Sequence, residues 1–472
     1  MDPEVGGSSP PSCTTRGPAQ IKLTCFKTYD VRGRVGYDLD EGIAYRIGRA
    51  FGQFLKAENV VVGCDARLSS PWLKAAVIEG LRDAGSNVVD LGLTGTEEIY
   101  FASFHLDVNG GIEITASHNP ADYNGMKFVG RGGRPIGIGD EFAGIRKLAD
   151  EDVFATASRR GGLSHASLLQ PYCAHLLSYI DVASLRPMKI VVDAGNGAAG
   201  HVINALETQL PQFQFIKINH EPDGNFPHGV PNPLIPEKRS RTGAAVRQHN
   251  ADLGVAWDGD FDRCFLFDEN GEYVSGYYLA GLLMQAFMAK DDHAKFVIDA
   301  RLFWNTLDIL KGSNHTYVMS RTGHTFFKQH MREIDAVYGG ESSSHHYFRD
   351  FAYCDSGMIP WLLVVEYLCR SGKKLHQLTA ARKALFPCSD EINFVVADVQ
   401  GVIESVLGHY RNSAASIDFT DGLNMEFDAW RFNLRGSNTE ALLRLNIETR
   451  GDAKLLDQKV GEITQLVNSI TS

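Results

Sequence analysis

Residues 111–128, GIEITASHNPADYNGMKF, decide how the N-terminal part of the chain folds, because an apolar strand ends there in a polar loop. The strand covers residues 112–115. An Asn-Pro pair soon after it turns the chain, since the residue before a proline is driven out of the helical region. The turn itself requires neither Ser117 nor His118. We therefore expect this pair to have either a local hydrogen-bonding role or a chemical one.

The same pattern of a β-branched strand followed by a loop and a helix recurs along the chain. The first such helix is expected to start with Ser70 as N-cap and Pro71 in its first turn. Four further strands of this kind are expected at residues 190–193, 252–257, 296–299 and 336–338. The last part is different, with alternating strands expected at residues 391–396, 424–427, 430–434 and 442–447.

These patterns predict three consecutive, similar α/β domains with mixed sheets and a smaller C-terminal α+β domain, arranged around a central cleft. After a disordered leader at residues 1–20, the four domains are expected at residues 21–160, 161–268, 269–383 and 384–472. In open α/β sheets, ligands bind at the carboxyl ends of the strands. The polar loops that follow the strands are therefore the places to look for a site.

Composition excludes some classes of function. The net charge of −11 argues against a nucleic-acid partner, because phosphate backbones select basic faces. The eight cysteines form no CxxC pair, which favours reduced thiols and a cytoplasmic location. No apolar run approaches the ~18 residues of a membrane span, and the first twenty residues lack the apolar centre of a signal peptide.

The segment WDGDFDR at residues 257–263 holds Asp258, Asp260 and Asp262 at alternate positions. If the segment is extended, all three carboxylates point to one side, and such a set of oxygen ligands suits Mg²⁺. An EF-hand is rejected, because Arg263 stands where that loop requires glycine. A solvated acidic turn is the plain alternative. Arg263 itself is interpreted as a cation that faces the ligand.

The glycines of VVDAGNGAAG at residues 191–200 match the G-x-G-x-x-G pattern of dinucleotide-binding loops. In such sites an acidic residue at the end of the next strand holds the ribose. Here the acid at the right distance, Glu221, belongs to a Pro-Asp-Gly turn. A structural turn between strand and helix is therefore favoured over NAD binding.

The loop RGSNTE at residues 435–440 is interpreted as a phosphate-binding cup. Small residues leave backbone N–H groups free to converge on an anion, and guanidinium groups offer planar forks to phosphate oxygens. The residues assigned to this cup are Arg435, Ser437, Asn438, Thr439 and Arg444. The alternative is an ordinary turn beside a surface arginine.

The loop GGESSSHH at residues 339–346 places Glu341, Ser343 and His345 at alternate positions beyond a strand. A carboxylate and a hydroxyl together can bind paired sugar hydroxyls, and chemistry alone does not distinguish His345 from His346. Arg301 and His324 follow other strands in the same way. A hydroxyl nucleophile, a hard-metal site, a phosphate cup and a hydroxyl-binding loop together indicate phosphoryl transfer involving a phosphorylated sugar.

Five motifs in order resemble those of the α-D-phosphohexomutase superfamily, most closely the bacterial phosphomannomutases of nucleotide-sugar and capsule synthesis. They are FKTYDVRG (26–33), TASHNPADYNGMK (115–127), DGDFDR (258–263), GGESSSHH (339–346) and RGSNTE (435–440). The resemblance implies that Ser117 is a phosphoserine and that one of its oxygens joins Asp258, Asp260 and Asp262 around Mg²⁺. It also implies that Ser117 phosphorylates mannose 1-phosphate or mannose 6-phosphate. The bound hexose 1,6-bisphosphate then turns around and returns its other phosphate.

The resemblance further assigns roles to single residues. Lys127 or His345 is the general acid or base, and the choice between them stays open. The catalytic neighbourhood implied is Ser117, His118, Lys127, Arg263, His345 and the phosphate-facing Arg32. The substrate contacts implied are Tyr29, Arg301, His324, Glu341, Ser343 and His345, with the RGSNTE cup holding the phosphate that does not react. Ser344 departs from the family pattern, since many relatives have glycine there, and Ser342 replaces a common methionine.

Several readings remain open. The resemblance favours a mutase for mannose phosphates, acting as a monomer or homodimer on small sugar phosphates. A dual mannose and glucose mutase, or a glucosamine phosphate mutase, uses the same motifs. A metal-dependent phosphatase would release phosphate instead, and a non-catalytic sugar-phosphate binding protein would tolerate the loss of Ser117.

Overall fold

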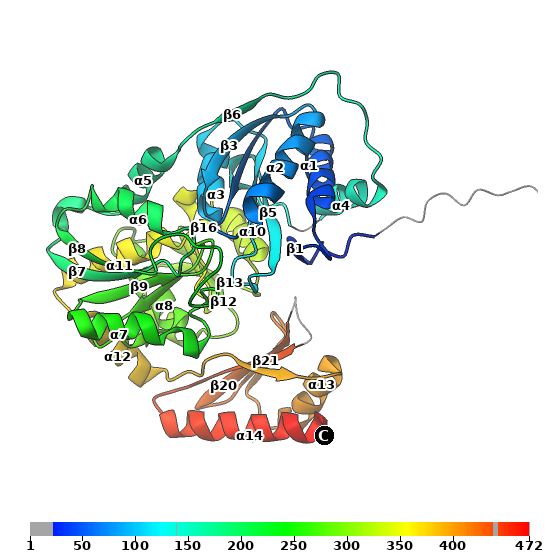
Figure 1. Ribbon diagram of the computed structural model, residues 1–472. Helices are drawn as coiled ribbons and strands as arrows, with labels where there is room; N and C mark the ends of the chain where they lie inside the picture. Colours follow the sequence, from blue (N-terminus) through cyan, green and yellow to red (C-terminus); the bar gives the residue numbers. More distant parts are fainter. Residues whose placement is uncertain (1–21, 138, 438–441, 472) are drawn as a thin grey trace, which may run out of the picture.

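The computed structural model describes residues 22–137, 139–437 and 442–471, which form four sheets, each with its own helices (Figure 1). We call the four parts domains I to IV. Asn438 and Thr439 of the expected phosphate cup lie outside the described residues. The expected fold class is confirmed: three α/β domains with mixed sheets precede a smaller domain with an antiparallel sheet.

Domain I contains a six-stranded sheet in the order β1-β5-β4-β2-β3-β6. Its strands are β1 (Val31–Arg34), β2 (Asn59–Cys64), β3 (Asn87–Leu93), β4 (Gly110–Ile114), β5 (Tyr123–Gly130) and β6 (Leu163–His165). Its helices are α1 (Glu41–Leu55), α2 (Ser70–Asp83), α3 (Thr96–His105) and α4 (Asp140–Glu151), with a 3-10 turn at Arg131–Gly133. The expectation that Ser70 caps α2 is wrong. Ser69 occupies that position, and the Ser70 hydroxyl instead donates to Asp65 at 2.5 Å.

Domain II has a five-stranded sheet in the order β11-β10-β9-β7-β8. Its strands are β7 (Met188–Asp193), β8 (Phe213–Ile218), β9 (Leu253–Trp257), β10 (Cys264–Phe267) and β11 (Tyr273–Val274). Its helices are α5 (Leu169–Leu177), α6 (Gly200–Glu207) and α7 (Ser240–His249), with 3-10 turns at Val182–Ser184 and Pro236–Lys238. Strands β7, β8 and β9 are parallel, whereas β9, β10 and β11 are antiparallel neighbours.

Domain III repeats this arrangement in the order β13-β12-β14-β15-β16. Its strands are β12 (Lys295–Asp299), β13 (Thr316–Ser320), β14 (Tyr338–Gly340), β15 (His346–Phe348) and β16 (Cys354–Asp355). Its helices are α8 (Gly276–Met288), α9 (Trp304–Leu310), α10 (His324–Ile334), α11 (Met358–Ser371) and α12 (Leu375–Leu385), with a 3-10 turn at Arg349–Phe351. The strand expected at residues 336–338 begins only at Tyr338, because its ladder with β12 runs from Tyr338 to Gly340.

Domain IV is an antiparallel sheet in the order β17-β21-β20-β19-β18 with two helices. Its strands are β17 (Ile392–Val395), β18 (Ser416–Asp418), β19 (Leu423–Glu426), β20 (Trp430–Gly436) and β21 (Leu442–Thr449). Its helices are α13 (Val399–Tyr410) and α14 (Ala453–Thr471). Figure 1 shows α14 along the side of this sheet that faces away from the other domains.

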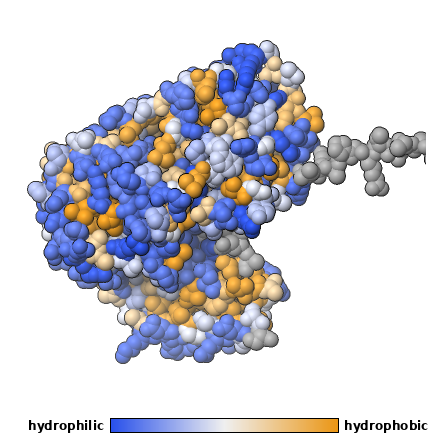
Figure 2. All heavy atoms as spheres, in the orientation of Figure 1, coloured by the Kyte–Doolittle hydropathy of each residue, from blue (hydrophilic) through white to orange (hydrophobic). Residues whose placement is uncertain are grey.

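The apolar cores of the domains are joined differently. Domains II and III share one continuous cluster that runs from Ile190 through Trp257 to Trp361 and also includes side chains of α3. Domain IV has a separate cluster whose members all lie between Ile392 and Ile470. Figure 2 shows the surface hollowed between domain IV and the domains above it. The first three domains therefore form one body to which domain IV is attached.

The contacts that attach domain IV to domain III are mostly polar. Glu448, fully buried, accepts hydrogen bonds from Arg431 of its own sheet at 2.8 Å and from the N–H of Phe303 at 2.9 Å. Its carboxylate also accepts from the hydroxyl of Tyr277. Trp304 donates to Glu426 across the same boundary at 2.8 Å. Among the described residues, no helix is long and apolar enough to cross a membrane.

Candidate active site

The loop that follows β4 presents Ser117 in a strained backbone conformation. Its φ of 48° lies in the left-handed region, which is uncommon for a residue other than glycine, and the residue is only 3% exposed. Such strain persists where the surroundings hold it in place, and it gathers at functional sites. The sequence pattern located this loop but could not show the strain.

Arg67 holds this loop in place. Its buried guanidinium donates to four backbone carbonyls, those of Ser117 (3.0 Å), Asn119 (2.6 Å), Pro120 (2.7 Å) and Tyr123 (2.9 Å). The planar fork of arginine suits this set of acceptors, and an ammonium group cannot reproduce it. Sequence reasoning missed Arg67, because it lies 50 residues before Ser117, in the loop between β2 and α2.

The hydroxyl of Ser117 faces the aspartates of domain II. Its Oγ donates to Oδ2 of Asp258 at 2.8 Å and lies 3.1 Å from Nδ1 of His118. Arg263 donates to the same Asp258 oxygen from Nε at 2.9 Å and from Nη2 at 2.6 Å, and Nη2 also lies 2.6 Å from Nδ1 of His118. Burial and the charge of Arg263 hold the pKa of His118 well below its usual value. His118 is therefore a neutral acceptor here.

Asp258, Asp260 and Asp262 come together, but not through an extended segment as expected. Phe261 has a φ of 47°, so the loop turns between the aspartates and directs their carboxylates inward. One oxygen of each lies within 4.8 Å of the others. All three Oδ1 atoms are buried, and none has a hydrogen-bond partner among the described residues. A buried set of unpartnered carboxylate oxygens fits a hard divalent cation such as Mg²⁺.

Lys127 places a positive charge beside this cluster. It lies on β5, and its Nζ is 2.7 Å from Oδ2 of Asp260 and forms a second short ion pair with Asp262. Burial opposes its charge, but the two aspartates raise the pKa of Lys127. Burial and the charge of Asp260 raise the pKa of Asp262 to about 7. The ammonium thus neutralises part of a charge that three carboxylates cannot carry alone.

The glycine-rich loop after β7 supports the metal loop and contains little space for a nucleotide. The N–H of Ala198 donates to the carbonyl of Gly259 at 3.1 Å, and a Cβ on Gly197 would lie 2.6 Å from that same oxygen. Pro231 covers Gly195, where a Cβ would lie 2.3 Å from the ring. This packing agrees with the preference for a structural turn over a dinucleotide site.

The loop after β14 directs Glu341 and His345 towards the same region. Glu341 accepts from the hydroxyl of Tyr347 at 2.6 Å, and its Oε2 lies 3.3 Å from Nδ1 of His345. Burial opposes ionisation of Glu341, but the hydrogen bond and charge of His345 lower its pKa to about 2. Ser343 Oγ is 3.2 Å from the same His345 nitrogen. His345 Nε2 lies 3.9 Å from Oδ1 of Asp262, which connects this loop to the metal loop.

His346 and Ser344 have other positions. His346 lies inside β15, fully buried, with Nδ1 2.7 Å from the hydroxyl of Tyr338, so it is part of the core. Ser344 has a φ of 67°, the conformation for which glycine is the favoured residue. The departure from the family pattern noted in the sequence therefore falls on a backbone position that suits glycine.

Of three further predicted residues, Arg32 contacts its own domain I, whereas Tyr29 of domain I meets His324 of domain III. Arg32 donates to Oδ1 of Asn119 in the Ser117 loop at 3.0 Å and to Asp30 at 2.9 Å. The ring of Tyr29 meets that of His324 edge-on, with centroids 5.9 Å apart. Burial lowers the pKa of His324 to about 3, so this histidine is neutral.

Two arginines of the expected phosphate cup, Arg435 and Arg444, point to the carboxylate of Glu391. Arg301 of domain III, predicted as a substrate contact, points to the same carboxylate. The backbone N–H of Ser437 donates to the carbonyl of Leu442 at 2.8 Å. The β20–β21 hairpin therefore uses this N–H, and the assignment of Ser437 to the cup stays a prediction.

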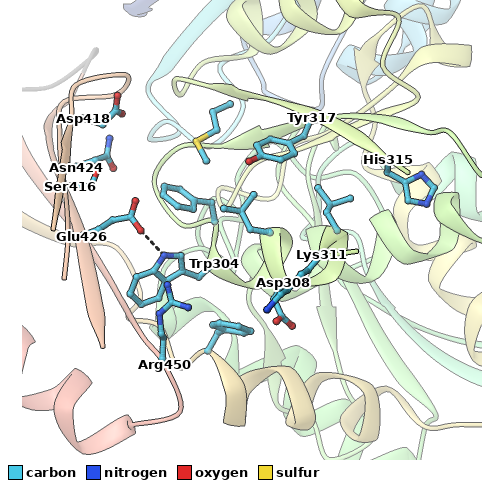
Figure 3. A pocket seen from close by; sticks show the side chains of 15 residues that line it. Trp304, Asp308, Lys311, His315, Tyr317, Ser416, Asp418, Asn424, Glu426 and Arg450 are labelled. Carbon is cyan, nitrogen blue, oxygen red and sulfur yellow. Dashed lines mark hydrogen bonds between the residues drawn. The ribbon is translucent and has the colours of Figure 1, made fainter. Parts of the chain in front are cut away.

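A separate cavity of about 520 Å³ opens between α9 and the strands β18 and β19 (Figure 3). The residues that line it include Phe303, Trp304, Asp308, Lys311 and Glu426. None of the residues predicted from the sequence as site residues lines it. The cavity lies at the boundary of domains III and IV and is distinct from the cluster around Ser117.

Comparison with known proteins agrees with this geometry. Four family models match in order: the phosphoglucomutase/phosphomannomutase α/β/α domains I (residues 23–154), II (170–271) and III (275–385), and the C-terminal domain (391–465). A phosphomannomutase of Vibrio cholerae serotype O1 is 54% identical over 459 residues, which cover 95% of this chain and 99% of the relative. A protein of Xanthomonas campestris pv. campestris described as phosphohexose mutases is 51% identical and covers 95% of this chain and 100% of its own.

Among solved structures, a phosphoglucomutase/phosphomannomutase family protein from Burkholderia thailandensis superposes with a TM-score of 0.84. Its sequence is 31% identical, and the superposition covers 95% of this chain and 98% of that one. The similarity therefore extends over all four domains.

Proposed function

The chain belongs to the phosphoglucomutase/phosphomannomutase family, and we propose that it interconverts mannose 6-phosphate and mannose 1-phosphate through a phosphorylated Ser117. The observation that carries the proposal is the position of the Ser117 hydroxyl, 2.8 Å from Asp258 and next to three buried carboxylates with unpartnered oxygens. The identity with curated phosphomannomutases over nearly the whole chain supports mannose phosphates as substrates.

In the proposed reaction, the phosphoryl group of Ser117 passes to the free hydroxyl of the bound monophosphate. The bond from phosphorus to Ser117 Oγ breaks as the bond to the sugar oxygen forms. The sugar hydroxyl loses its proton to His345, or to Lys127 once its ammonium has passed a proton to the leaving Ser117 oxygen. The product is a bound hexose 1,6-bisphosphate. After it turns around, its other phosphoryl group returns to Ser117, and the other monophosphate leaves.

The residues of the site divide this work. Mg²⁺ held by Asp258, Asp260, Asp262 and a phosphoserine oxygen would neutralise charge on the transferring group. Arg263 and His118 contact the Ser117 hydroxyl, and Arg32 holds its loop through Asn119. Glu341 and Ser343 would bind sugar hydroxyls, with His345 between them and the aspartates. Tyr29, Arg301 and His324 would contact the substrate, and Arg435, Ser437, Asn438, Thr439 and Arg444 would hold the phosphate that does not react.

We further propose that the enzyme works in the cytoplasm. The seven described cysteines are all unpaired, and five of them are buried, as expected of thiols in a reducing compartment. A role for mannose 1-phosphate in GDP-mannose and polysaccharide synthesis follows from the same proposal.

The test is turnover of mannose 1-phosphate with Mg²⁺ and a trace of hexose 1,6-bisphosphate, with free phosphate monitored throughout. Glucose 1-phosphate and glucosamine 1-phosphate run in parallel, and Ser117→Ala is the control. Mannose turnover well above the others, lost in Ser117→Ala and without phosphate release, is the expected result. Equal glucose turnover would indicate a dual-specificity mutase, free phosphate a hydrolase, and no turnover a binding protein.

A further inference from the structure

A carboxylate of the chain itself pairs with both arginines of the proposed phosphate cup, Arg435 and Arg444, and with the nearby Arg301 of domain III. Oε2 of Glu391 lies 3.0 Å from Nη2 of Arg435 and 3.4 Å from Nη1 of Arg301, and Oε1 lies 3.1 Å from Nη1 of Arg444. Two of these guanidinium groups are almost fully buried, with 4% of the side chain exposed for Arg435 and 3% for Arg301. The carboxylate of Glu391 is 27% exposed, so it forms the side of the cluster that solvent reaches.

Glu391 lies in the connection between domains III and IV, between the end of α12 at Leu385 and the start of β17 at Ile392. Arg301 follows β12 of domain III, whereas Arg435 and Arg444 lie on β20 and β21 of domain IV. The carboxylate therefore joins guanidinium groups of two domains at the point where the chain passes from one to the other.

The same carboxylate ends a row of alternating charges that begins at the metal loop. Asp262 lies 3.9 Å from His345, His345 lies 3.3 Å from Glu341, and Glu341 lies 3.9 Å from Arg301. Arg301 then meets Glu391 at 3.4 Å. Although burial opposes ionisation, Arg301, Arg435 and Arg444 lower the pKa of Glu391, so it carries its negative charge at neutral pH.

A carboxylate and a phosphate compete for the same guanidinium forks, because each presents a pair of anionic oxygens that accept charge-assisted hydrogen bonds. Arg301 also pairs with Asp299 at 2.6 Å, and Arg435 lies 3.7 Å from Asp421. Among the described residues, Glu391 is the carboxylate that contacts all three guanidinium groups, so without it their positive charges would be less well compensated, which is unfavourable. An internal carboxylate lowers the free energy of the empty cup and therefore weakens net phosphate binding. This matters for a reaction whose intermediate must release one phosphate and present the other.

We propose that Glu391 is a resident counter-ion of the phosphate cup, which the substrate phosphate displaces and which re-pairs with the arginines each time the phosphate leaves. Glu391 is thus a positioning residue that favours release of the bisphosphate for its turn. The inference rests on the proposed function, since the cup is assigned through it.

The test measures binding without turnover, in a Ser117→Ala background, by titration calorimetry with mannose 1-phosphate and separately with inorganic phosphate. Glu391→Gln removes the charge and keeps the shape, so both ligands are expected to bind about 10-fold tighter, as loss of one like charge at this distance predicts. In the enzyme with Ser117 intact, the same change is expected to lower KM and kcat together, because release slows. Glu391→Asp is expected to restore the ordinary affinity in part.

Asp390→Asn is the matched control. Asp390 is the preceding residue and carries the same charge, but it pairs with Arg239 of domain II at 3.2 Å and not with the cup. It is expected to leave phosphate affinity unchanged. Equal or weaker binding by Glu391→Gln would overturn the inference, because the carboxylate would then only orient the arginines.

An Arg435→Ala arm separates this inference from the proposed function. If Arg435→Ala does not weaken binding of either ligand, the assignment of the cup is wrong and the inference about Glu391 falls with it. If inorganic phosphate shows the expected pattern and mannose 1-phosphate does not bind, the sugar is wrong but the role of Glu391 stands.

Discussion

The carbonyl oxygen of Ser117 accepts a hydrogen bond of 3.0 Å from the buried guanidinium of Arg67. This bond is one of four from the same side chain to the backbone of the Ser117 loop. Arg67 therefore holds the backbone that positions Ser117.

Arg67→Lys is expected to lower kcat about 100-fold, because a small misplacement of a reacting group has an effect of this order. Some carbonyls lose their donor, so the free energy of unfolding should also fall by about 1–3 kcal/mol. Steady-state kinetics and urea unfolding measure the two effects. Arg131→Lys, at an exposed arginine of the same domain, is the control and should change neither. An unchanged kcat in Arg67→Lys would show that the loop holds itself.

Gly95 lies where α3 meets the metal loop. A Cβ at this position would lie 2.1 Å from the ring of Phe261 and 2.6 Å from the carbonyl of Asp260. Gly95→Ala is therefore expected to displace the metal loop, to destabilise the protein by about 1–3 kcal/mol and to weaken Mg²⁺ binding. Thermal unfolding with and without Mg²⁺ measures both.

Gly461→Ala is the comparison for that variant, because nothing lies within 4 Å of a Cβ placed there in α14. It is expected to stabilise the protein by about 0.4–1 kcal/mol. If Gly95→Ala behaved in the same way, the close packing of α3 on the metal loop would not constrain the site.

Lys127 and a metal ion compete for Asp260 and Asp262. Lys127→Met is expected to increase the rise in melting temperature that Mg²⁺ produces, because binding to the folded state alone stabilises it. The same variant should lose most of its turnover. Asp260→Asn should instead reduce the rise in melting temperature that Mg²⁺ produces. If Mg²⁺ raised the melting temperature equally in both variants and in the unchanged protein, the metal would not bind at these aspartates.

Glu97 is expected to make the stability of the protein depend on pH. It is fully buried, and burial raises its pKa well above 4.5. Above about pH 4.5 the unfolded chain loses this proton while the folded protein keeps it, so stability falls as pH rises, by at most about 1.4 kcal/mol per pH unit. Glu97→Gln should flatten this slope in urea unfolding between about pH 5 and pH 7. Glu41→Gln, at an exposed carboxyl, should leave it unchanged.

Much of the fold was predictable from local pattern. Strands such as β2 and β12 are short β-branched or aromatic runs in which every position but the first is buried. An apolar run of this length predicts a buried strand, so the pattern located them correctly. The boundaries were harder. The apolar run at residues 336–338 reads as a strand, but only Tyr338 onwards pairs with β12. Pairing with a neighbour, and not local composition, decides where such a strand begins.

The site was predictable where residue type alone carries the chemistry, as for the three aspartates of the metal loop. Their convergence depends on the left-handed Phe261, which no alternation of residues reveals. Arg67 and Glu391 could not be identified from the sequence, for a different reason. Each acts through contacts with residues about 40 or more positions away, and a lone arginine or glutamate in a loop carries no local signal.

The separate apolar core of domain IV has a consequence for how the protein melts. Cooperative unfolding spreads through shared apolar packing, and this packing ends where the chain enters domain IV. The contacts of Glu448 and Trp304 that span the boundary are hydrogen bonds and not shared apolar packing. Calorimetry should therefore resolve two transitions, with the smaller heat belonging to domain IV. A bound sugar phosphate that contacts both parts should merge them into one.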